Sequence, residues 1–258
     1  GRLVAVIGAG PAGMEAAVTL KQRGFDVVVF DKRDEIGGNL HVAKKPPFKG
    51  KFEWAIDYYK SMAKKLNITM KLGKEVTAQE VLALKPYSIL VATGSNVISI
   101  PLEGLDQVQT VQAHDVLAND MQFANKKVVV IGGGITGLET ALYINRQGTN
   151  QVSVDMLPEW PVDMLDMRYQ NEALLEVRHC NDQGVALFYN NKVVKFADGK
   201  LFIESTKDGE VKELPADVIV LSVGVKPNDA LWQELLASGH PSVWKAGDAI
   251  ATGKINKA

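Results

Sequence analysis

The feature that most constrains how this chain can fold is an internal repeat with a constant offset of 124 residues. Each copy holds an apolar run, a glycine-rich loop, a helical pattern that ends at a glycine, and a second apolar run that ends at an aspartate. The matching positions are Gly8 and Gly132, Gly13 and Gly137, Glu15 and Glu139, Gly24 and Gly148, and Asp31 and Asp155. Strand, helix and strand in this order predict a βαβ unit with parallel strands, present twice.

Both glycine-rich loops have the spacing G-x-G-x-x-G between a predicted strand and a predicted helix. The first glycine makes the tight turn, the second lets the backbone approach a pyrophosphate, and the third lets helix and strand pack closely. The helix N-terminus offers unpaired N–H groups to the phosphates. Asp31 and Asp155 stand where a carboxylate accepts hydrogen bonds from a ribose. The alternative, two tight turns with no nucleotide, does not explain why both loops carry the full pattern.

Outside the repeat, the pattern predicts further helices and strands. Helices are expected at 52–66 and 77–84, a strand end at 73–76, and strands at 87–91 and 217–223; the segment 243–248 closes the chain. Four more strands, at 185–189, 192–196, 200–205 and 210–214, are expected to form a β-meander. The predicted fold class is therefore α/β, with two Rossmann-like, doubly wound dinucleotide-binding domains, the second inserted in the first.

The composition excludes several function classes. The net charge is −1, and no basic footprint of a nucleic-acid binder is present. No apolar stretch approaches the roughly 18 residues of a membrane helix, so no membrane partner is expected. Cys180 is the single cysteine, which excludes an intrachain disulfide and fits a reducing, cytoplasmic setting. The histidines have no ligand spacing, so no metal site is expected.

Taken together, these motifs resemble those of the two-dinucleotide-binding-domain flavoproteins. Within that group the chain most resembles the C-terminal part of the 2,4-dienoyl-CoA reductase, 2-enoate reductase and trimethylamine dehydrogenase family. Three segments carry the resemblance: the run from Gly8 to Ala17, the segment from Ala43 to Phe48 with its two prolines, and Gly247-Asp248-Ala249 followed by Lys254-Ile255.

The resemblance implies that the first glycine loop and Asp31 hold the ADP half of FAD, and that Gly37-Gly38 passes near the flavin. It implies that the second loop, with Glu139, binds NAD(P)H, and that Asp248 contacts the ribityl and pyrophosphate part of FAD. The candidate cofactor-binding residues are Gly8, Gly10, Pro11, Ala12, Gly13, Asp31, Lys32, Gly38, Asn39, Leu40, Val76, Ala92, Thr93, Gly94, Gly132, Gly134, Ile135, Thr136, Gly137, Glu139, Asp155, Gly224, Gly247 and Asp248.

The resemblance also implies a discontinuous FAD domain, residues 1–110 and 222–258, with an NAD(P)-binding domain at 111–221 between them. Relatives of this kind carry FMN and iron–sulfur domains upstream, so we expect this chain to be a fragment of such a parent and those domains to be its partners.

The function implied is that of a FAD-dependent oxidoreductase module that passes a hydride from NAD(P)H to FAD. NADH is favoured because the Asp155 carboxylate repels a 2′-phosphate and the next basic residue, Arg168, is distant in the chain. No catalytic side chain is nominated, because the cofactors carry this chemistry. The alternative is a non-catalytic module that binds ADP or NAD and stabilises a larger flavoprotein.

Overall fold

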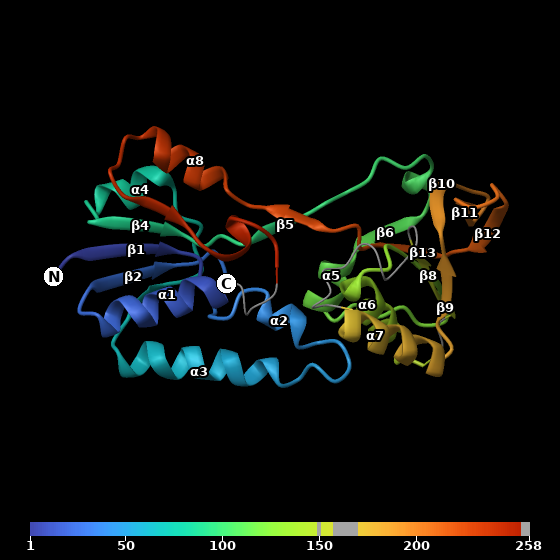
Figure 1. Ribbon diagram of the computed structural model, residues 1–258, viewed down its shortest axis with the longest axis horizontal. Coiled ribbons are helices and arrows are strands. Elements are labelled where there is room, and N and C mark those ends of the chain that lie inside the picture. The colour runs from blue at the N-terminus through green and yellow to red at the C-terminus, as the bar shows by residue number, and fades with distance from the viewer. Residues whose placement is uncertain (149–150, 157–169, 254–258) are drawn as a thin grey trace. The chain divides into compact units, whose positions relative to one another are not determined.

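The computed structural model describes residues 1–148, 151–156 and 170–253. The chain divides into two compact units, and each is a parallel sheet covered on both faces (Figure 1). The first unit comprises Gly1–Lys44, Gly50–Asn96 and Val225–Ala258, and the second unit comprises Lys45–Lys49 and Val97–Gly224.

The first unit has a five-stranded sheet in the order β15-β4-β1-β2-β3, with every neighbouring pair parallel. Both faces of its central strands are buried, which explains their continuous apolar sequences. Alternate residues of β2 pack against α1 and α3 on one face and against α4 and α8 on the other (Figure 1). Its elements are β1 (Leu3–Ile7), α1 (Pro11–Gln22), β2 (Asp26–Phe30), α2 (Leu40–Ala43), α3 (Phe52–Lys65), β3 (Thr69–Lys71), α4 (Ala78–Ala83), β4 (Ser88–Val91), α8 (Ala230–Ala237), β15 (Val243–Lys245) and the 3-10 turn η3 (Gly247–Ala249).

The second unit repeats this architecture with the sheet order β6-β13-β7-β8-β9, again all parallel. Helices α6 and α7 contribute to the core on one face, and an antiparallel sheet of β10, β11 and β12 packs on the other. Its elements are η1 (Leu105–Gln107), β6 (Gln109–Gln112), α5 (Ala113–Ala118), β7 (Lys127–Ile131), α6 (Ile135–Asn145), β8 (Gln151–Met156), α7 (Gln170–Asp182), β9 (Ala186–Tyr189), β10 (Asn191–Ala197), β11 (Lys200–Ser205), β12 (Val211–Pro215) and β13 (Val218–Leu221). A separate two-stranded sheet pairs β5 (Ser95–Val97) with β14 (Val225–Pro227).

The predicted fold class is confirmed, and so are the helices expected at 52–66 and 77–84. Two strand predictions were wrong. The strand end expected at 73–76 lies outside the sheet, because the strand that pairs with β2 is Thr69–Lys71 and ends before residue 73. The meander has three strands rather than four, since the strand at Ala186–Tyr189 pairs in parallel with β8 and so extends the main sheet.

The boundaries between the units also differ from the expected domain boundaries. The sequence placed residues 97–110 in the FAD domain, but in the structure they group with the second unit. Ile100, Leu102 and Leu105 pack against the apolar core beneath β10 to β12, which accounts for the difference.

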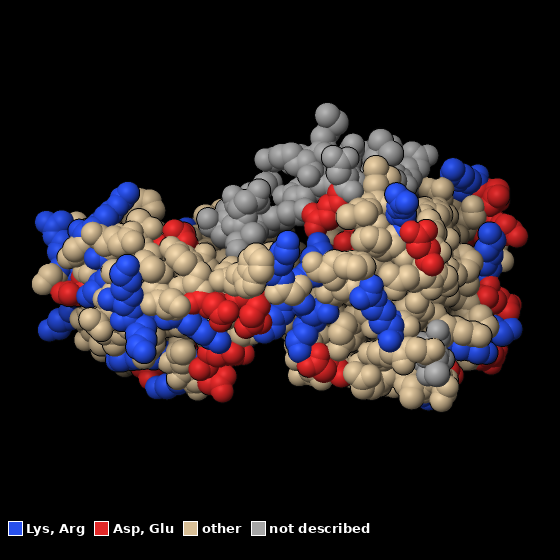
Figure 2. All heavy atoms as spheres, turned by 90° about the horizontal axis from the view of Figure 1, so that it is seen from below, with Lys and Arg blue, Asp and Glu red and all other residues tan. Residues whose placement is uncertain are grey.

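Within the described part of the chain, no helix combines the length and apolarity that crossing a membrane requires. Those residues also contain no group of three or more His, Cys, Asp or Glu side chains arranged to hold a metal ion. On the face drawn in Figure 2, basic and acidic side chains are interspersed rather than gathered in one basic patch.

Candidate functional site

The first glycine loop joins β1 to α1, and two of its glycines are required by packing alone. A Cβ on Gly8, whose φ is 114°, would lie 2.1 Å from the carbonyl oxygen of Ala92 at the end of β4. A Cβ on Gly13 would lie 1.9 Å from the carbonyl oxygen of Gly8. Gly10 differs, because its Cβ would meet only the Cα of Gly38, at 3.9 Å. The protein therefore leaves space beside Gly10 that a ligand's pyrophosphate would need.

The second loop, between β7 and α6, has the same geometry. A Cβ on Gly132 would lie 2.3 Å from the carbonyl oxygen of Ser222, and one on Gly137 would lie 1.9 Å from that of Gly132. A Cβ on Gly134 would meet no described atom within 4 Å. Ser222, at the end of β13, thus does in the second unit what Ala92 does in the first. The repeat offset did not reveal this equivalence, because the insertions between loop and strand differ in length.

Both helices begin without a side-chain cap. Gly10 and Gly134 are the N-cap residues of α1 and α6, and neither helix has a side-chain hydrogen bond at its cap. Pro11 occupies the first turn of α1, where its missing N–H costs nothing. The free N–H groups of each first turn, which include Ile135 and Thr136 in α6, are then available to an anion such as a phosphate.

Two other predicted segments converge on the first loop. The backbone N–H of Gly37 donates to the carbonyl oxygen of Ala9 at 2.9 Å, and a Cβ on Gly38 would lie 2.8 Å from the Cα of Gly10. A Cβ on Gly247 would lie 2.7 Å from the Cβ of Ala12 in α1. The structure therefore brings together glycines from three parts of the chain. Asn39 and Leu40 follow at the start of α2.

The end of β4 and the turn η3 meet at the same edge of the first sheet. The Thr93 hydroxyl donates to the carbonyl oxygen of Asn228 at 2.5 Å, and the Asn228 N–H donates to the carbonyl oxygen of Gly94 at 2.9 Å. The Asp248 carboxylate accepts from the Ser95 hydroxyl at 3.3 Å and from the Gly253 N–H at 2.9 Å. These bonds hold the Asp248 carboxylate at this edge.

The remaining predicted residues are placed differently. Lys32 is exposed, next to Asp31, whereas Val76 is buried in the core under α4. Gly224, with a φ of 104°, follows the end of β13, and its carbonyl oxygen accepts from the Ile98 N–H at 3.0 Å. Arg168 and the Lys254-Ile255 pair lie outside the described residues.

The two aspartates at the strand ends are not equivalent in the structure. Ile7 pairs with Phe30, so that Asp31 follows the paired segment, whereas Ile131 pairs with Asp155 itself. In the second copy one more residue separates the helix-ending glycine from the paired strand, which shifts the register by one. The equivalence suggested by the constant offset was therefore wrong at this position.

The carboxylates of these aspartates also differ in their partners. Asp31 accepts from the backbone N–H of Ala9 at 2.6 Å and from that of Arg33 at 2.8 Å. Asp155 is fully buried, and neither oxygen has a hydrogen-bond partner within the described part of the chain. Burial raises the pKa of Asp155 to about 7. A buried carboxylate without a donor is unfavourable, and ribose hydroxyls are donors that would satisfy it.

Glu139 on α6 forms an ion pair that the sequence did not reveal. The ammonium of Lys49 lies 2.8 Å from its carboxylate. Lys49 comes from the segment between α2 and α3, and only the Pro46-Pro47 pair marked that segment as unusual.

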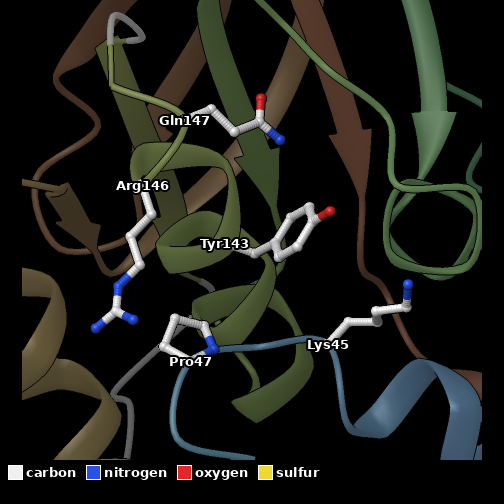
Figure 3. Close-up of a pocket in the computed structure, with 5 residues that line it drawn as sticks. All are labelled: Lys45, Pro47, Tyr143, Arg146 and Gln147. Atoms are coloured by element: carbon white, nitrogen blue, oxygen red, sulfur yellow. The ribbon is translucent and has the colours of Figure 1, made fainter. Parts of the chain in front are cut away.

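A hollow of about 300 Å³ lies at the opposite end of α6 from the glycine loop. Its lining residues are Lys45, Pro47, Tyr143, Arg146 and Gln147 (Figure 3). Lys45 and Arg146 point away from each other, and the Lys45 ammonium and the Tyr143 hydroxyl are both bound to Asp120. None of the predicted cofactor-binding residues lines this hollow, so we do not assign the cofactor site to it.

Comparison with known protein families identifies the family of this chain. The family of pyridine nucleotide-disulphide oxidoreductases matches residues 2–255. The chain belongs to that family. The membership and the relatives below confirm the predicted resemblance, the oxidoreductase class and the use of FAD and NAD(P)H.

The relatives are longer proteins. An NADH oxidase of Thermoanaerobacter brockii is 32% identical over 98% of this chain and 38% of that protein, and a bilirubin reductase of Mediterraneibacter gnavus is 34% identical over 87% and 34%. Among solved structures, a 2-naphthoyl-CoA reductase complex has a TM-score of 0.87 at 29% identity and covers 99% of this chain and 38% of its own. Histamine dehydrogenase from Rhizobium sp. 4-9 shares the fold, with a TM-score of 0.89 at 22% identity. The chain thus spans about two fifths of the length of such relatives.

The disulphide chemistry in the family name has no counterpart within this chain. Cys180 is its single cysteine and is buried. Burial, with a smaller effect of the nearby Glu176 charge, raises the pKa of its thiol to about 12, so the thiolate is not formed at neutral pH.

The glycine geometry predicts that two substitutions three residues apart have different effects. Gly137→Ala should lower the free energy of unfolding by about 2 to 3 kcal/mol, because its Cβ collides with backbone. Gly134→Ala should change stability by less than about 1 kcal/mol, as expected for a cap position, but weaken NADH binding about tenfold or more. Chemical denaturation and calorimetric titration measure the two effects. Equal destabilisation by both variants would contradict the assignment.

The buried carboxylate of Asp155 predicts a pH dependence of stability. Its pKa is raised in the folded state, so the folded protein binds a proton more tightly than the unfolded chain between about pH 4 and pH 7. Stability contributed by this group is therefore lost as the pH rises through that range. Asp155→Asn should stabilise the ligand-free protein by up to about 4 kcal/mol at pH 8, and by less at pH 5. Thermal unfolding at both pH values tests this; an equal effect at the two would show that the carboxylate has a donor.

Proposed function

We propose that this chain is the electron-input module of a flavoprotein, with FAD held by the first unit and NADH by the second. The sequence-based division gave residues 1–110 and 222–258 to FAD and 111–221 to NAD(P)H; the two units follow it except at residues 45–49, 97–110 and 222–224, which group with the second unit. When both are bound, the nicotinamide supplies a hydride and the flavin accepts it. The protein's own contribution is to bind the two dinucleotides and to orient them.

The observation that carries the proposal is the space beside Gly10 and Gly134. In each loop the outer glycines are explained by packing, but the middle one is not. Each middle glycine also caps a helix that has no side-chain cap. A pyrophosphate explains both features, because it needs close approach to the backbone and accepts hydrogen bonds from the first-turn N–H groups. FMN has no pyrophosphate, which favours FAD in the first unit.

The choice of NADH over NADPH rests on Asp155 and on the relatives. An unpartnered carboxylate at the end of β8 suits a 2′-hydroxyl and disfavours a 2′-phosphate. The NADH oxidase relative matches 98% of the chain, whereas a glutamate synthase [NADPH] small chain matches 62% at the same identity.

For the whole protein we propose a longer enzyme related to 2-enoate reductases, in which further domains receive the electrons. The relatives that match this chain are more than twice its length, which supports such a parent. FMN and iron–sulfur domains are the partners that the resemblance implies, and the cytoplasm is the setting that the cysteine usage favours.

The proposal predicts that FAD-loaded protein is reduced by NADH about tenfold or more faster than by NADPH at equal concentration. Loss of the oxidised-flavin absorbance under anaerobic conditions measures the rate. Gly134→Ala should slow the reduction without releasing FAD, whereas Gly10→Ala should weaken FAD binding. Binding of NADH without any flavin reduction would instead support a non-catalytic nucleotide-binding module, and a preference for NADPH would contradict the role of Asp155.

A second prediction concerns the electron acceptor. The chain should pass electrons to a small quinone or dye but not to an enoate, a dienoyl-CoA ester or a disulfide. A disulfide reductase needs a pair of thiols, and an iron–sulfur relay needs about four cysteine ligands, whereas Cys180 is alone in the chain. Anaerobic NADH consumption with each acceptor in turn tests this. Turnover with an enoate as sole acceptor would reveal a substrate site within these residues.

A further inference from the structure

The segment Lys45–Lys49, here called the strap, belongs to a different unit from the residues on either side of it. Lys44 and Gly50 are part of the first unit, whereas the strap groups with the second. Its backbone includes Pro46 and Pro47, which have no N–H to donate. The strap is neither helix nor strand, so its side chains must account for its position.

Lys49 anchors one end of the strap to two helices. Its ammonium lies 2.8 Å from the carboxylate of Glu139 on α6, 2.7 Å from that of Glu172 and 3.9 Å from that of Glu176, both on α7. The Lys49 side chain is only 18% exposed. One partly buried cation is thus shared by three carboxylates, and charge-assisted contacts of this kind are stronger than surface ion pairs.

Phe48 is held in an unfavourable backbone conformation. Its φ is 67°, in the left-handed region that aromatic residues avoid. The ring is 68% exposed, yet its centroid lies 4.9 Å from the His179 ring and 4.7 Å from the Arg146 guanidinium. Such a conformation persists only where neighbouring contacts maintain it. The strap is therefore under constraint at the residue next to Lys49.

The strap also follows a single face of α6. Lys45 and Tyr143 share the carboxylate of Asp120, at 2.5 Å and 2.9 Å, and Pro47 lies beside them at the hollow (Figure 3). The helix residues involved are Glu139, Tyr143 and Arg146, which have the i, i+4, i+7 spacing of one helical face. The same helix begins at the second glycine loop, and Glu139 is two residues after Gly137.

We propose that the strap is held on α6 and α7 by Lys49, and that this ion-pair contact becomes stronger when a dinucleotide binds the second glycine loop. This coupling rests on the proposed function of the second unit. Phosphates at the α6 N-terminus would add negative charge within about a turn of Glu139, which strengthens the attraction for Lys49. Because binding couplings are reciprocal, Lys49 must in turn favour dinucleotide binding. Lys49 is thus a positioning residue for the nucleotide site.

The test measures strap opening in FAD-loaded protein with NAD⁺ as the probe, which avoids flavin reduction. Chymotrypsin cleavage after Phe48 and hydrogen exchange of residues 45–50 both report opening. In the wild type, saturating NAD⁺ should slow cleavage about fivefold or more. Lys49→Gln should be cleaved about tenfold faster than wild type and bind NAD⁺ about tenfold more weakly. Lys49→Arg should retain both properties.

Lys44→Gln is the matched control. Lys44 precedes the strap and pairs with Glu53 in the first unit, so its loss removes the same charge but should alter neither strap cleavage nor NAD⁺ affinity. The hydrogen-exchange experiment on wild-type protein needs no variant, so it stands even where a substitution impairs folding.

Two failures can be told apart. If NAD⁺ does not protect the backbone of residues 132–137, the second loop binds no dinucleotide. Both the proposed function and the proposed coupling to the strap are then overturned. If NAD⁺ protects that loop but strap opening is unchanged, only the proposed coupling to the strap is overturned. Cleavage of Lys49→Gln at the wild-type rate would likewise overturn it.

Discussion

The close approach of backbone to backbone at the two glycine loops is the constraint on which the rest of this structure depends. In each loop the third glycine lies where a Cβ would be 1.9 Å from the carbonyl oxygen of the first. That approach lets the helix begin directly above the sheet edge, pointing its N-terminus along the end of the strand. The ends of β4 and β13 close against the same turns through Ala92 and Ser222. A parallel sheet with its helix ends converging at one edge follows from this packing.

The same edge explains why the nucleotide residues come from distant parts of the chain. The carboxyl ends of parallel strands meet along one side of a sheet, and ligands of open α/β sheets bind there. In the first unit this edge gathers the glycine loop, Gly37-Gly38, the end of β4 and the Gly247-Asp248 turn, and the first and last of these segments are more than 200 residues apart. The order of motifs along the chain is thus a consequence of strand order in the sheet.

The two units share this geometry but differ in the partners of their acidic side chains. In the first, Asp31 is bound by two backbone N–H groups, one of them from the glycine loop itself. In the second, Asp155 is buried and its carboxylate has no hydrogen-bond partner in the described part of the chain, and burial raises its pKa. The acidic residue after each third glycine differs too: Glu15 accepts from Tyr59 at 3.3 Å, whereas Glu139 is paired with the strap lysine. The two copies of the repeat therefore differ in the contacts that their acidic residues make, whereas their glycines are the same.

The sequence by itself determined the fold class, both glycine loops and the family, because each rests on local rules: strand and helix periodicity, and glycine where no Cβ fits. Helix α3 was predictable to within a residue for the same reason. Tertiary structure alone decided what depends on pairing between segments. The pairing register of β8 places Asp155 one position earlier relative to its strand than Asp31. Strand β9 pairs with β8 and is therefore not part of the meander. The contact between Lys49 and Glu139 joins residues 90 positions apart in the sequence, and no local pattern encodes it. Strand register and long-range ion pairs each depend on two segments of the chain. The sequence pattern of one segment alone therefore does not predict them.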